Sequence, residues 1–365
     1  MSNRFINHAA PGLASLRPYV PGKPLSELER ELGISGSIKL ASNENPLGPS
    51  SRVRAAIEQQ IADLPRYPDG GAFELRRALA KRHAVDAACV TVGNGSNDVL
   101  DMIARVFLWA GRESLFSQYA FAVYPLSSMA VGAELRVAPA LDYGHDLGVM
   151  RQMITAQTGV IWIANPNNPT GTRLDRVALR GFIEAVPPEV IVVIDEAYFE
   201  YVQDQDFPDA SQWLVDFPNL IVTRTFSKAY GLAALRVGYA VSHPDVADLL
   251  NRVRQPFNVD SFAQAAALAA LGDHDHLRRS IEINDQGMRQ LVEGVQRLGL
   301  DHIPSAGNFL TIDLGRDAGP VDQALLRLGV VTRPVANYGL PNHLRVSIGL
   351  KAENARLLDA LEQVL

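Results

Sequence analysis

The stretch LIVTRTFSKAYG occupies residues 220–231 and joins an apolar run to hydroxyl side chains and a lysine. The run 220–222 predicts a buried strand, because short apolar runs bounded by polar residues are typical of strands in parallel sheets. Thr225, Ser227 and Lys228 therefore stand at the carboxyl end of that strand. In open α/β sheets, ligands bind at this edge. The sequence thus predicts an α/β fold with a binding site there.

The residue types after this strand suit a phosphorylated carbonyl compound. The hydroxyls of Thr225 and Ser227 can donate to a phosphate, and Arg236 can add a charge-assisted hydrogen bond. Lys228 stands among cations, which lowers its pKa and frees its amine to attack a carbonyl. A reactive lysine beside a phosphate site is the combination that holds pyridoxal phosphate as a Schiff base. For Ser-Lys alone, an exposed turn with surface cations is the alternative, and the remaining motifs decide against it.

Composition limits the class of protein. A chain of 365 residues exceeds one ordinary core, so we expect two domains. The hydrophobic content of 47% and charged content of 20% are typical of a soluble globular protein. The net charge of −6 argues against nucleic acid or an anionic membrane surface as a partner. Cys89 is the single cysteine, and no apolar run reaches transmembrane length, so we expect a cytoplasmic protein.

The periodicity of the chain changes near residue 258. Before that point, short apolar segments predict strands near 90–92, 113–116, 134–138, 159–164, 190–194, 219–223 and 236–241. Helical patterns lie near 51–63, 73–83, 99–108, 121–131, 149–156 and 174–185. This alternation predicts a mostly parallel sheet with helices on both faces. After that point, we expect helices at 262–271, 275–298, 321–328 and 352–364 and strands at 309–313, 330–333 and 343–347.

These patterns predict three parts of the chain. Residues 41–260 form a large cofactor-binding domain, and residues 261–365 form a small α+β domain. Residues 1–40 are rich in proline and glycine and have little apolar surface to bury among themselves. We therefore expect this N-terminal arm to join the small domain or to cross another subunit.

Two further strand ends carry polar groups. The loop Asn-Pro-Asn-Asn-Pro-Thr-Gly at 165–171 is a rigid turn, and its Asn168 can offer an amide to a phenolate oxygen. The apolar run 190–194 ends in Asp195, whose buried carboxylate needs a partner. A protonated pyridine nitrogen would be such a partner and would make the ring an electron sink. The alternative is that Asp195 caps the next turn. Tyr198 can face the same pocket.

A glycine-containing turn precedes one of the predicted helices. The backbone amides of Gly95, Ser96 and Asn97 at that helix N-terminus suit a phosphate. A dinucleotide fingerprint would need a glycine where Asp98 stands, which disfavours a Rossmann dehydrogenase. Tyr119 follows another predicted strand and can stack on a flat ring, although core packing is the usual role of such a tyrosine.

These motifs together resemble the fold-type I pyridoxal-phosphate aminotransferases. Within that group, several stretches resemble the histidinol-phosphate aminotransferase family: YVPGKP at 19–24, ASNENP at 41–46, RYPDG at 66–70, FSKAYGL at 226–232 and YGLPNHLRVS at 338–347. The resemblance covers nearly the whole chain. One departure is the Gly-Ser-Asn turn at 95–97, where some relatives carry an Ala-Asp-Glu type of sequence.

The resemblance implies a role for each matching cofactor residue. Lys228 would form the Schiff base and move the proton, and Asp195 would pair with the pyridine nitrogen. Asn168 and Tyr198 would hold the ring oxygen, and Tyr119 would stack on the ring. The groups around the cofactor phosphate would be Ser96, Thr225, Ser227 and Arg236, helped by Tyr67 from the other subunit of a homodimer with shared active sites.

The resemblance also implies a substrate side and a reaction. Arg345 and Arg333 would hold the anionic group of the substrate, and Tyr19 and Asn43 would line the substrate side. The reaction would be amino transfer from L-histidinol phosphate to 2-oxoglutarate, giving imidazole-acetol phosphate and L-glutamate in histidine biosynthesis.

Other functions fit parts of the sequence. An aromatic aminotransferase or a decarboxylase of a phosphorylated amino acid would use the same scaffold. A transcription regulator with an aminotransferase-like domain would need a DNA-binding module, and about forty residues before the cofactor domain are too few for one. The run Asp273-His274-Asp275-His276 suggests a metal site, but a helix cap at Asp273 explains it better, and no metal is expected.

Overall fold

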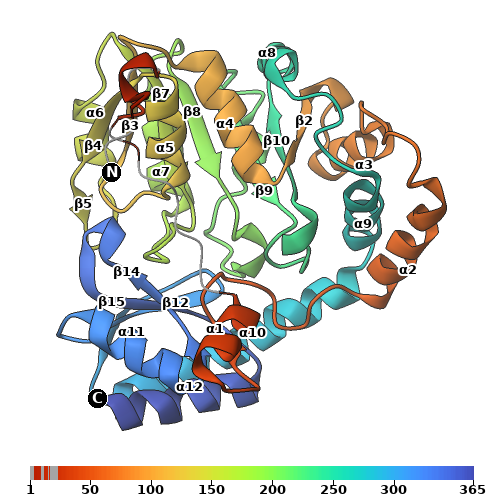
Figure 1. The fold of residues 1–365 in the computed structure, drawn as a ribbon. Coiled ribbons are helices and arrows are strands. Elements are labelled where there is room, and N and C mark those ends of the chain that lie inside the picture. The colour runs from red at the N-terminus through yellow and green to blue at the C-terminus, as the bar shows by residue number, and fades with distance from the viewer. Residues whose placement is uncertain (1–3, 10–11, 15, 17–23) are drawn as a thin grey trace.

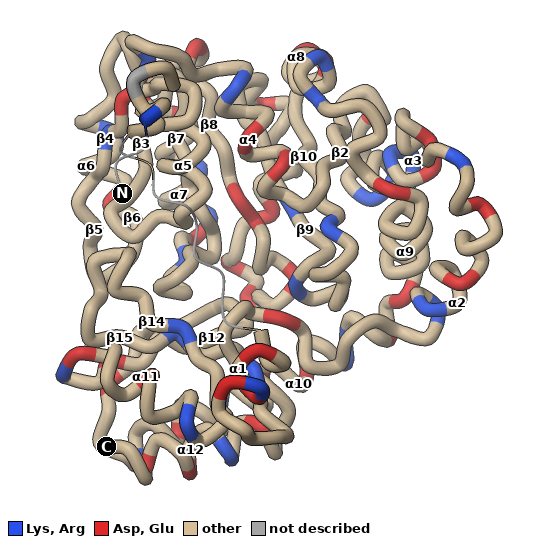
Figure 2. The backbone as a smooth tube through the Cα atoms, viewed as in Figure 1, with Lys and Arg blue, Asp and Glu red and all other residues tan. Residues whose placement is uncertain are grey.

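The computed structural model describes residues 4–9, 12–14, 16 and 24–365. Figure 1 shows a larger upper part, built on a seven-stranded sheet, and a smaller lower part, built on a four-stranded sheet. In Figure 2, acidic and basic residues are scattered among one another over both the larger and the smaller part. Within the described residues, no helix combines the length and the apolar character needed to span a membrane.

The large sheet confirms the predicted α/β class. Its strand order is β2-β10-β9-β8-β7-β3-β4, and β10 is antiparallel to both neighbours while the remaining pairs are parallel. Each strand lies within two residues of its predicted position. The bounds are β2 Val90–Asn94, β3 Glu113–Ser117, β4 Glu134–Ala138, β7 Thr158–Ala164, β8 Ile191–Asp195, β9 Leu220–Thr225 and β10 Val237–Ser242.

Helices cover both faces of this sheet, and alternate strand residues enter two separate cores. On one face, Val193 and Ile221 pack with helices α4, α5 and α8; on the other, Val192 and Val222 pack with α7 and α9. Because successive side chains of a strand point to opposite faces, neighbouring residues at a strand end point toward different helix layers. The helices are α2 Ser51–Gln60, α3 Phe73–His83, α4 Ser96–Phe107, α5 Val123–Ala130, α6 Leu147–Gln152, α7 Arg176–Glu184, α8 Pro244–Val253 and α9 Ser261–Leu271.

Helix α8 is absent from the sequence prediction. It begins with a proline at its first position, where the missing N–H costs no hydrogen bond, and the side chain of His243 accepts from Asp245 N. It buries Val246, Ala247 and Leu250, a short apolar stripe with helical spacing. The sequence analysis also omits the short hairpin of β5 (Ala140–Leu141) and β6 (Gly144–His145).

The small part has an antiparallel sheet in the order β11-β12-β15-β14. Its core joins Leu310 and Leu344 on the sheet to Leu291 and Leu357 on helices. The strand predicted at 330–333 is two strands, because the chain changes partner there. The elements are α10 His274–Arg297, β11 Asp301–Ile303, β12 Phe309–Asp313, α11 Ala318–Arg327, β13 Val330–Val331, β14 Arg333–Val335, β15 Leu340–Ser347 and α12 Lys351–Val364.

The described residues near the N-terminus touch both parts. Strand β1 (Ile38–Lys39) pairs in parallel with β13, and Leu28 of α1 (Leu25–Leu32) packs with Val331. Gly12, by contrast, lies against the backbone of Met129 in α5. The division into an arm at 1–40, a large domain at 41–260 and a small domain at 261–365 stays a prediction.

Candidate active site

A cavity of about 370 Å³ lies at the carboxyl edge of the parallel strands, where the large and small parts meet. It brings together segments that are far apart in sequence. The residues predicted from the sequence that line it are Asn43, Ser96, Asn97, Asn168, Asp195, Tyr198, Thr225, Ser227, Lys228, Arg236, Arg333 and Arg345.

Lys228 follows β9 and places its amine in the cavity. Its Nζ donates to Ser42 O at 3.0 Å and lies 5.8 Å from the centre of the Tyr198 ring. Burial is the main cause that lowers the Lys228 pKa to about 7, with Arg345 and Arg236 adding to the effect. The sequence indicates only the neighbouring cations as a cause of this shift, and burial comes before them. A large fraction of the amine is therefore neutral, and nucleophilic, near pH 7.

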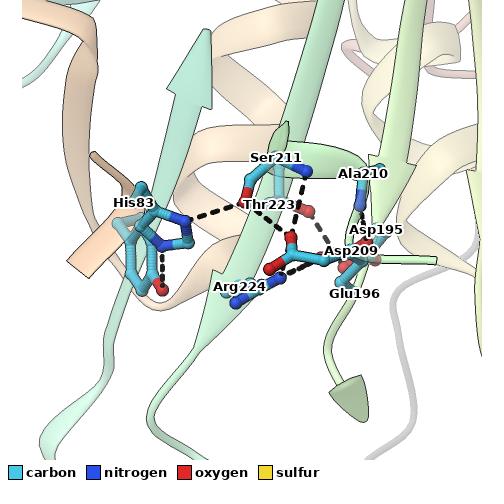
Figure 3. Close-up of polar contacts among 9 residues, drawn as sticks. His83, Asp195, Glu196, Asp209, Ala210, Ser211, Thr223 and Arg224 are labelled. Carbon is cyan, nitrogen blue, oxygen red and sulfur yellow. Dashed lines mark hydrogen bonds and ion pairs between the residues drawn. The ribbon is translucent and has the colours of Figure 1, made fainter. Parts of the chain in front are cut away.

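Asp195 ends β8 and is 4% exposed. Its Oδ1 accepts from Thr223 Oγ1 at 2.9 Å (Figure 3), and its Oδ2 accepts from Tyr124 Oη at 2.8 Å. Burial raises the Asp195 pKa, and these two hydrogen bonds oppose the rise. Neither donor is predicted from the sequence. Thr223 lies opposite Asp195 in the β8–β9 pairing, but a register between strands is not visible in the sequence.

The N-terminus of α4 forms a corner suited to a phosphate. Gly95 precedes this helix with a φ of 78°, and a Cβ there would lie 2.4 Å from Arg236 Nη2. Only glycine therefore lets the guanidinium approach the backbone before Ser96 and Asn97. Arg236 Nη1 also donates to Ser227 Oγ at 3.2 Å. Helix amides, a hydroxyl and a guanidinium around one space are the donor set that a phosphate needs.

Asn168 and Tyr198 present donors on another wall of the cavity. Asn168 Oδ1 accepts from Arg345 Nη1 at 2.6 Å, so its amide nitrogen remains as the donor for a ligand. Tyr198 Oη accepts from Asn43 Nδ2 at 2.9 Å. Burial raises the Tyr198 pKa to about 12, so the phenol stays protonated at neutral pH and can donate.

Of the two aromatic residues Tyr119 and Phe121 that follow β3, Phe121 lines the cavity. The Tyr119 ring lies 5.9 Å from the Tyr143 ring, and Tyr119 is not among the described residues that line the cavity. Both aromatic residues follow β3, and the sequence gives no signal for which of them turns inward.

Tyr67, another residue predicted for the site, is not brought to this cavity. Tyr67 is 83% exposed, and its ring stacks on Phe257 with centroids 4.7 Å apart. Tyr19 lies outside the described residues. The prediction that Tyr67 acts in a partner's site is untested by a single chain.

The small sheet contributes two arginines. Arg333 in β14 and Arg345 in β15 are direct partners in the antiparallel pairing, and both line the cavity. Arg345 is 7% exposed, and its Nη2 donates to Ala41 O at 2.8 Å. Like charges directly opposite each other on neighbouring strands are unfavourable. A bound anion would offset this repulsion, so the pair indicates an anion site.

The run at 273–276 has the predicted structural role. Asp273 Oδ1 accepts from His276 N at 3.2 Å and caps α10. Among the described residues, no three His, Cys, Asp or Glu side chains are grouped so that they could hold a metal ion.

The fold and this donor set define a class of protein, and comparison with known families agrees. A family model described as aminotransferase class I and II matches residues 35–361. The chain therefore belongs to the class I and II aminotransferases.

Curated relatives and solved structures narrow the resemblance. The chain is 60% identical over 363 residues to histidinol-phosphate aminotransferase 2 of Pseudomonas aeruginosa, covering 99% of this chain and 98% of the relative. It is 54% identical to histidinol-phosphate aminotransferase 2 of Methylococcus capsulatus, covering 98% of each. A histidinol-phosphate aminotransferase from Sinorhizobium meliloti, solved with pyridoxal-5'-phosphate, superposes with a TM-score of 0.88 at 30% identity and covers 97% of this chain and 96% of its own. The family resemblance inferred from the sequence is confirmed.

Proposed function

We propose that this chain transfers the amino group of L-histidinol phosphate to 2-oxoglutarate, giving imidazole-acetol phosphate and L-glutamate in cytoplasmic histidine biosynthesis. The 60% identity to a relative of that name over nearly the full length supports the reaction. The observation that carries the substrate class is the pair Arg333 and Arg345, directly opposite on neighbouring strands at the cavity.

Two guanidiniums match a phosphorylated amino donor. A guanidinium group can bind two phosphate oxygens at once through two parallel N–H groups, and two guanidinium groups suit the double negative charge of a phosphate ester. Arg345 alone suffices for the carboxylate of glutamate in the second half-reaction. Phenylalanine or tyrosine offers one carboxylate and no phosphate, so neither supplies the dianion that suits two guanidiniums.

The cavity fits pyridoxal phosphate. Asp195 is a buried carboxylate that a protonated pyridine nitrogen would pair, Asn168 and Tyr198 offer donors to the ring oxygen, and Phe121 offers an aromatic surface. The groups proposed for the cofactor phosphate are Gly95, Ser96, Asn97, Thr225, Ser227 and Arg236. When bound, this cofactor supplies an electron sink for the bond broken at the substrate's α-carbon.

The chain's own residues then bind, orient and move a proton. Lys228 Nζ would hold the cofactor covalently and, once released, would carry the proton at the substrate carbon, because its pKa of about 7 suits proton transfer near neutral pH. Asp195 would hold the proton on the pyridine nitrogen. Tyr198 stays protonated and would keep the ring oxygen in place.

The substrate assignment is tested by steady-state rates with L-histidinol phosphate, phenylalanine and tyrosine as donors. Arg345→Ala lowers kcat/KM for histidinol phosphate and for glutamate, and Arg333→Ala affects the phosphorylated donor more. Each loss is about 10- to 150-fold, since a charge-assisted contact contributes about 1.5–3 kcal/mol. Arg278→Ala, at an exposed ion pair with Asp275, is the control. Faster turnover of phenylalanine or tyrosine would overturn the donor but leave the aminotransferase class, and release of carbon dioxide would indicate a decarboxylase.

The proposal includes a homodimer with shared active sites. Tyr67 is exposed on a turn whose neighbouring segments also expose apolar side chains, which is typical of an interaction surface. These side chains are Ile61, Leu64, Phe73 and Phe257.

Subunit exchange tests the shared site. Mixing inactive Lys228→Ala with an impaired Tyr67→Phe variant gives heterodimers in which one site carries both changes and the other carries none. Activity then rises above that of either variant alone. Verified exchange without any rise would place Tyr67 outside the partner's site.

A further inference from the structure

Tyr124 lies behind the cavity and touches Asp195. Its side chain is 0% exposed, it is not among the described residues lining the cavity, and its hydroxyl donates to Asp195 Oδ2 at 2.8 Å. Asp195 is separated from it by 71 residues in the chain. A buried hydroxyl needs a partner, and this one has the carboxylate proposed to face the cofactor.

The packing of helix α5 fixes the direction of this hydroxyl. The Tyr124 ring stacks on the Trp162 ring with centroids 5.2 Å apart and planes 9° apart. The Phe121 ring meets it edge-on at 5.8 Å. Trp162 is held in turn by its Nε1, which donates to Ser114 Oγ at 2.9 Å. A ring held between two aromatic neighbours cannot turn its hydroxyl toward another acceptor.

Thr223 completes the arrangement from the neighbouring strand. Its Oγ1 donates to Asp195 Oδ1 at 2.9 Å, while Tyr124 on helix α5 donates to Oδ2, so each carboxylate oxygen accepts from a side chain on a different element. Two donors on different elements fix both the plane and the position of the carboxylate. Such donors also favour the charged form of a buried carboxylate.

We propose that Tyr124 is a positioning residue for amino transfer, which together with Thr223 orients the Asp195 carboxylate and stabilises its negative charge toward the pyridine nitrogen of the cofactor. The proposal rests on the function assigned above to Asp195. It adds to that function a residue that touches neither substrate nor cofactor.

The test compares two tyrosine hydroxyls of one sheet domain. Tyr124→Phe keeps the ring stacking and removes only the donor to Asp195. Tyr239→Phe removes an equally buried hydroxyl, 3% exposed, that bonds His83 on the other face of the sheet. We expect Tyr124→Phe to weaken binding of pyridoxal phosphate to the apoprotein about 10-fold or more and to lower kcat similarly, because hydrogen bonds to charged groups are the stronger ones. Tyr239→Phe should change both less than 3-fold.

The pH dependence gives a second readout. The hydrogen bond from Tyr124 lowers the Asp195 pKa, so its removal raises that pKa. The pH below which the apoprotein loses affinity for pyridoxal phosphate therefore moves upward in Tyr124→Phe. Thr223→Val should move it in the same direction, which keeps the test available if one variant folds poorly, as judged by the melting temperature of the apoprotein.

A double-mutant cycle separates this inference from the proposed function. If Tyr124 acts through Asp195, adding Tyr124→Phe to Asp195→Asn lowers kcat much less than Tyr124→Phe lowers it alone. Equal losses in both backgrounds would overturn the positioning role, as would matching losses in Tyr124→Phe and Tyr239→Phe. Near-normal activity of Asp195→Asn itself would instead overturn the function proposed for Asp195.

Discussion

The two faces of β8 and β9 differ at the carboxyl ends of these strands. On the α4–α5 face, Asp195 and Thr223 bond each other beside the cavity. On the opposite face, the next residue along each strand, Glu196 and Arg224, forms a buried ion pair (Figure 3). Glu196 Oε2 accepts from Arg224 Nε at 2.9 Å and Nη2 at 2.7 Å. We call these sides the cofactor face and the ion-pair face.

The ion-pair face continues as a chain of hydrogen bonds within the protein. Arg224 Nη2 also donates to Asp209 Oδ1, which in turn accepts from Ser211 Oγ at 2.5 Å. Since the Ser211 proton goes to Asp209, its oxygen accepts from His83 Nδ1–H, and His83 Nε2 accepts from the Tyr239 hydroxyl. Figure 3 shows this chain of hydrogen bonds running from His83 through Ser211 and Asp209 to Arg224.

This difference shows that one face of a pair of strands can supply the groups of a binding site while the opposite face stabilises the fold. On the ion-pair face, polar groups satisfy one another, and 0% exposure of Glu196 leaves no room for a ligand. On the cofactor face, the same strand ends present polar atoms to a cavity. A change on the cofactor face should therefore alter activity more than stability, and the reverse should hold on the other face.

The largest effect is expected on the cofactor face for Lys228→Ala. Activity should fall by more than about 10⁴-fold, because the covalent attachment and the proton carrier proposed for this residue would both be lost. The free energy of unfolding of the apoprotein should not fall, since a buried amine with a lowered pKa is removed. Borohydride reduction and peptide mapping measure the attachment, and a label on another lysine would contradict the role of Lys228.

Asp195→Asn is the next largest change on that face. A neutral amide cannot hold the pyridine proton, so kcat/KM should fall about 150- to 5000-fold, as for loss of one partner of a buried pair, about 3–5 kcal/mol. Chemical denaturation of the apoprotein should show little loss of stability, because the buried carboxylate already has a raised pKa. An unfolded variant, or one with normal turnover, would break the contrast between the faces.

Glu196→Gln makes the same chemical change one residue later, on the ion-pair face. The amide introduced there would still offer an oxygen as acceptor to Arg224. Its NH2 group, however, would face the backbone N–H of Ala210, which donates to Glu196 Oε1 at 3.0 Å, so two hydrogen-bond donors would meet. The free energy of unfolding should fall by about 1–3 kcal/mol. The turnover rate of the enzyme with pyridoxal phosphate bound, measured below its melting temperature, should change less than about 3-fold. A loss of activity as large as that of Asp195→Asn would show that the two faces are not separate.

The smallest effect concerns the pH dependence of stability at His83. Burial, and then the charge of Arg224, lowers the His83 pKa from 6.5 to about 3 in the folded protein. A lowered folded pKa gives stability that is complete above pH 6.5 and is lost as the pH falls toward 3. The slope in that window is at most about 1.4 kcal/mol per pH unit. In His83→Gln, unfolding free energies should depend less on pH between 6.5 and 4; curves parallel to those of the native chain would contradict this.

The sequence by itself determined the parts that depend on local pattern. Short apolar runs ended by polar residues located Asp195 and Lys228 at strand ends, because the order of apolar and polar residues along one strand is local information. The glycine turn before α4 was equally readable, since a helix N-terminus needs donors that only nearby residues supply.

Only the tertiary structure decided how distant segments meet. The register of β14 on β15 sets Arg333 opposite Arg345, and the packing of α5 chooses Phe121 for the cavity and Tyr124 for Asp195. The depth of the cavity makes burial the first cause of the lowered Lys228 pKa. Each of these depends on contacts between residues far apart in the chain. Such contacts arise when both faces of a sheet are covered at once, and no local pattern of residues encodes them.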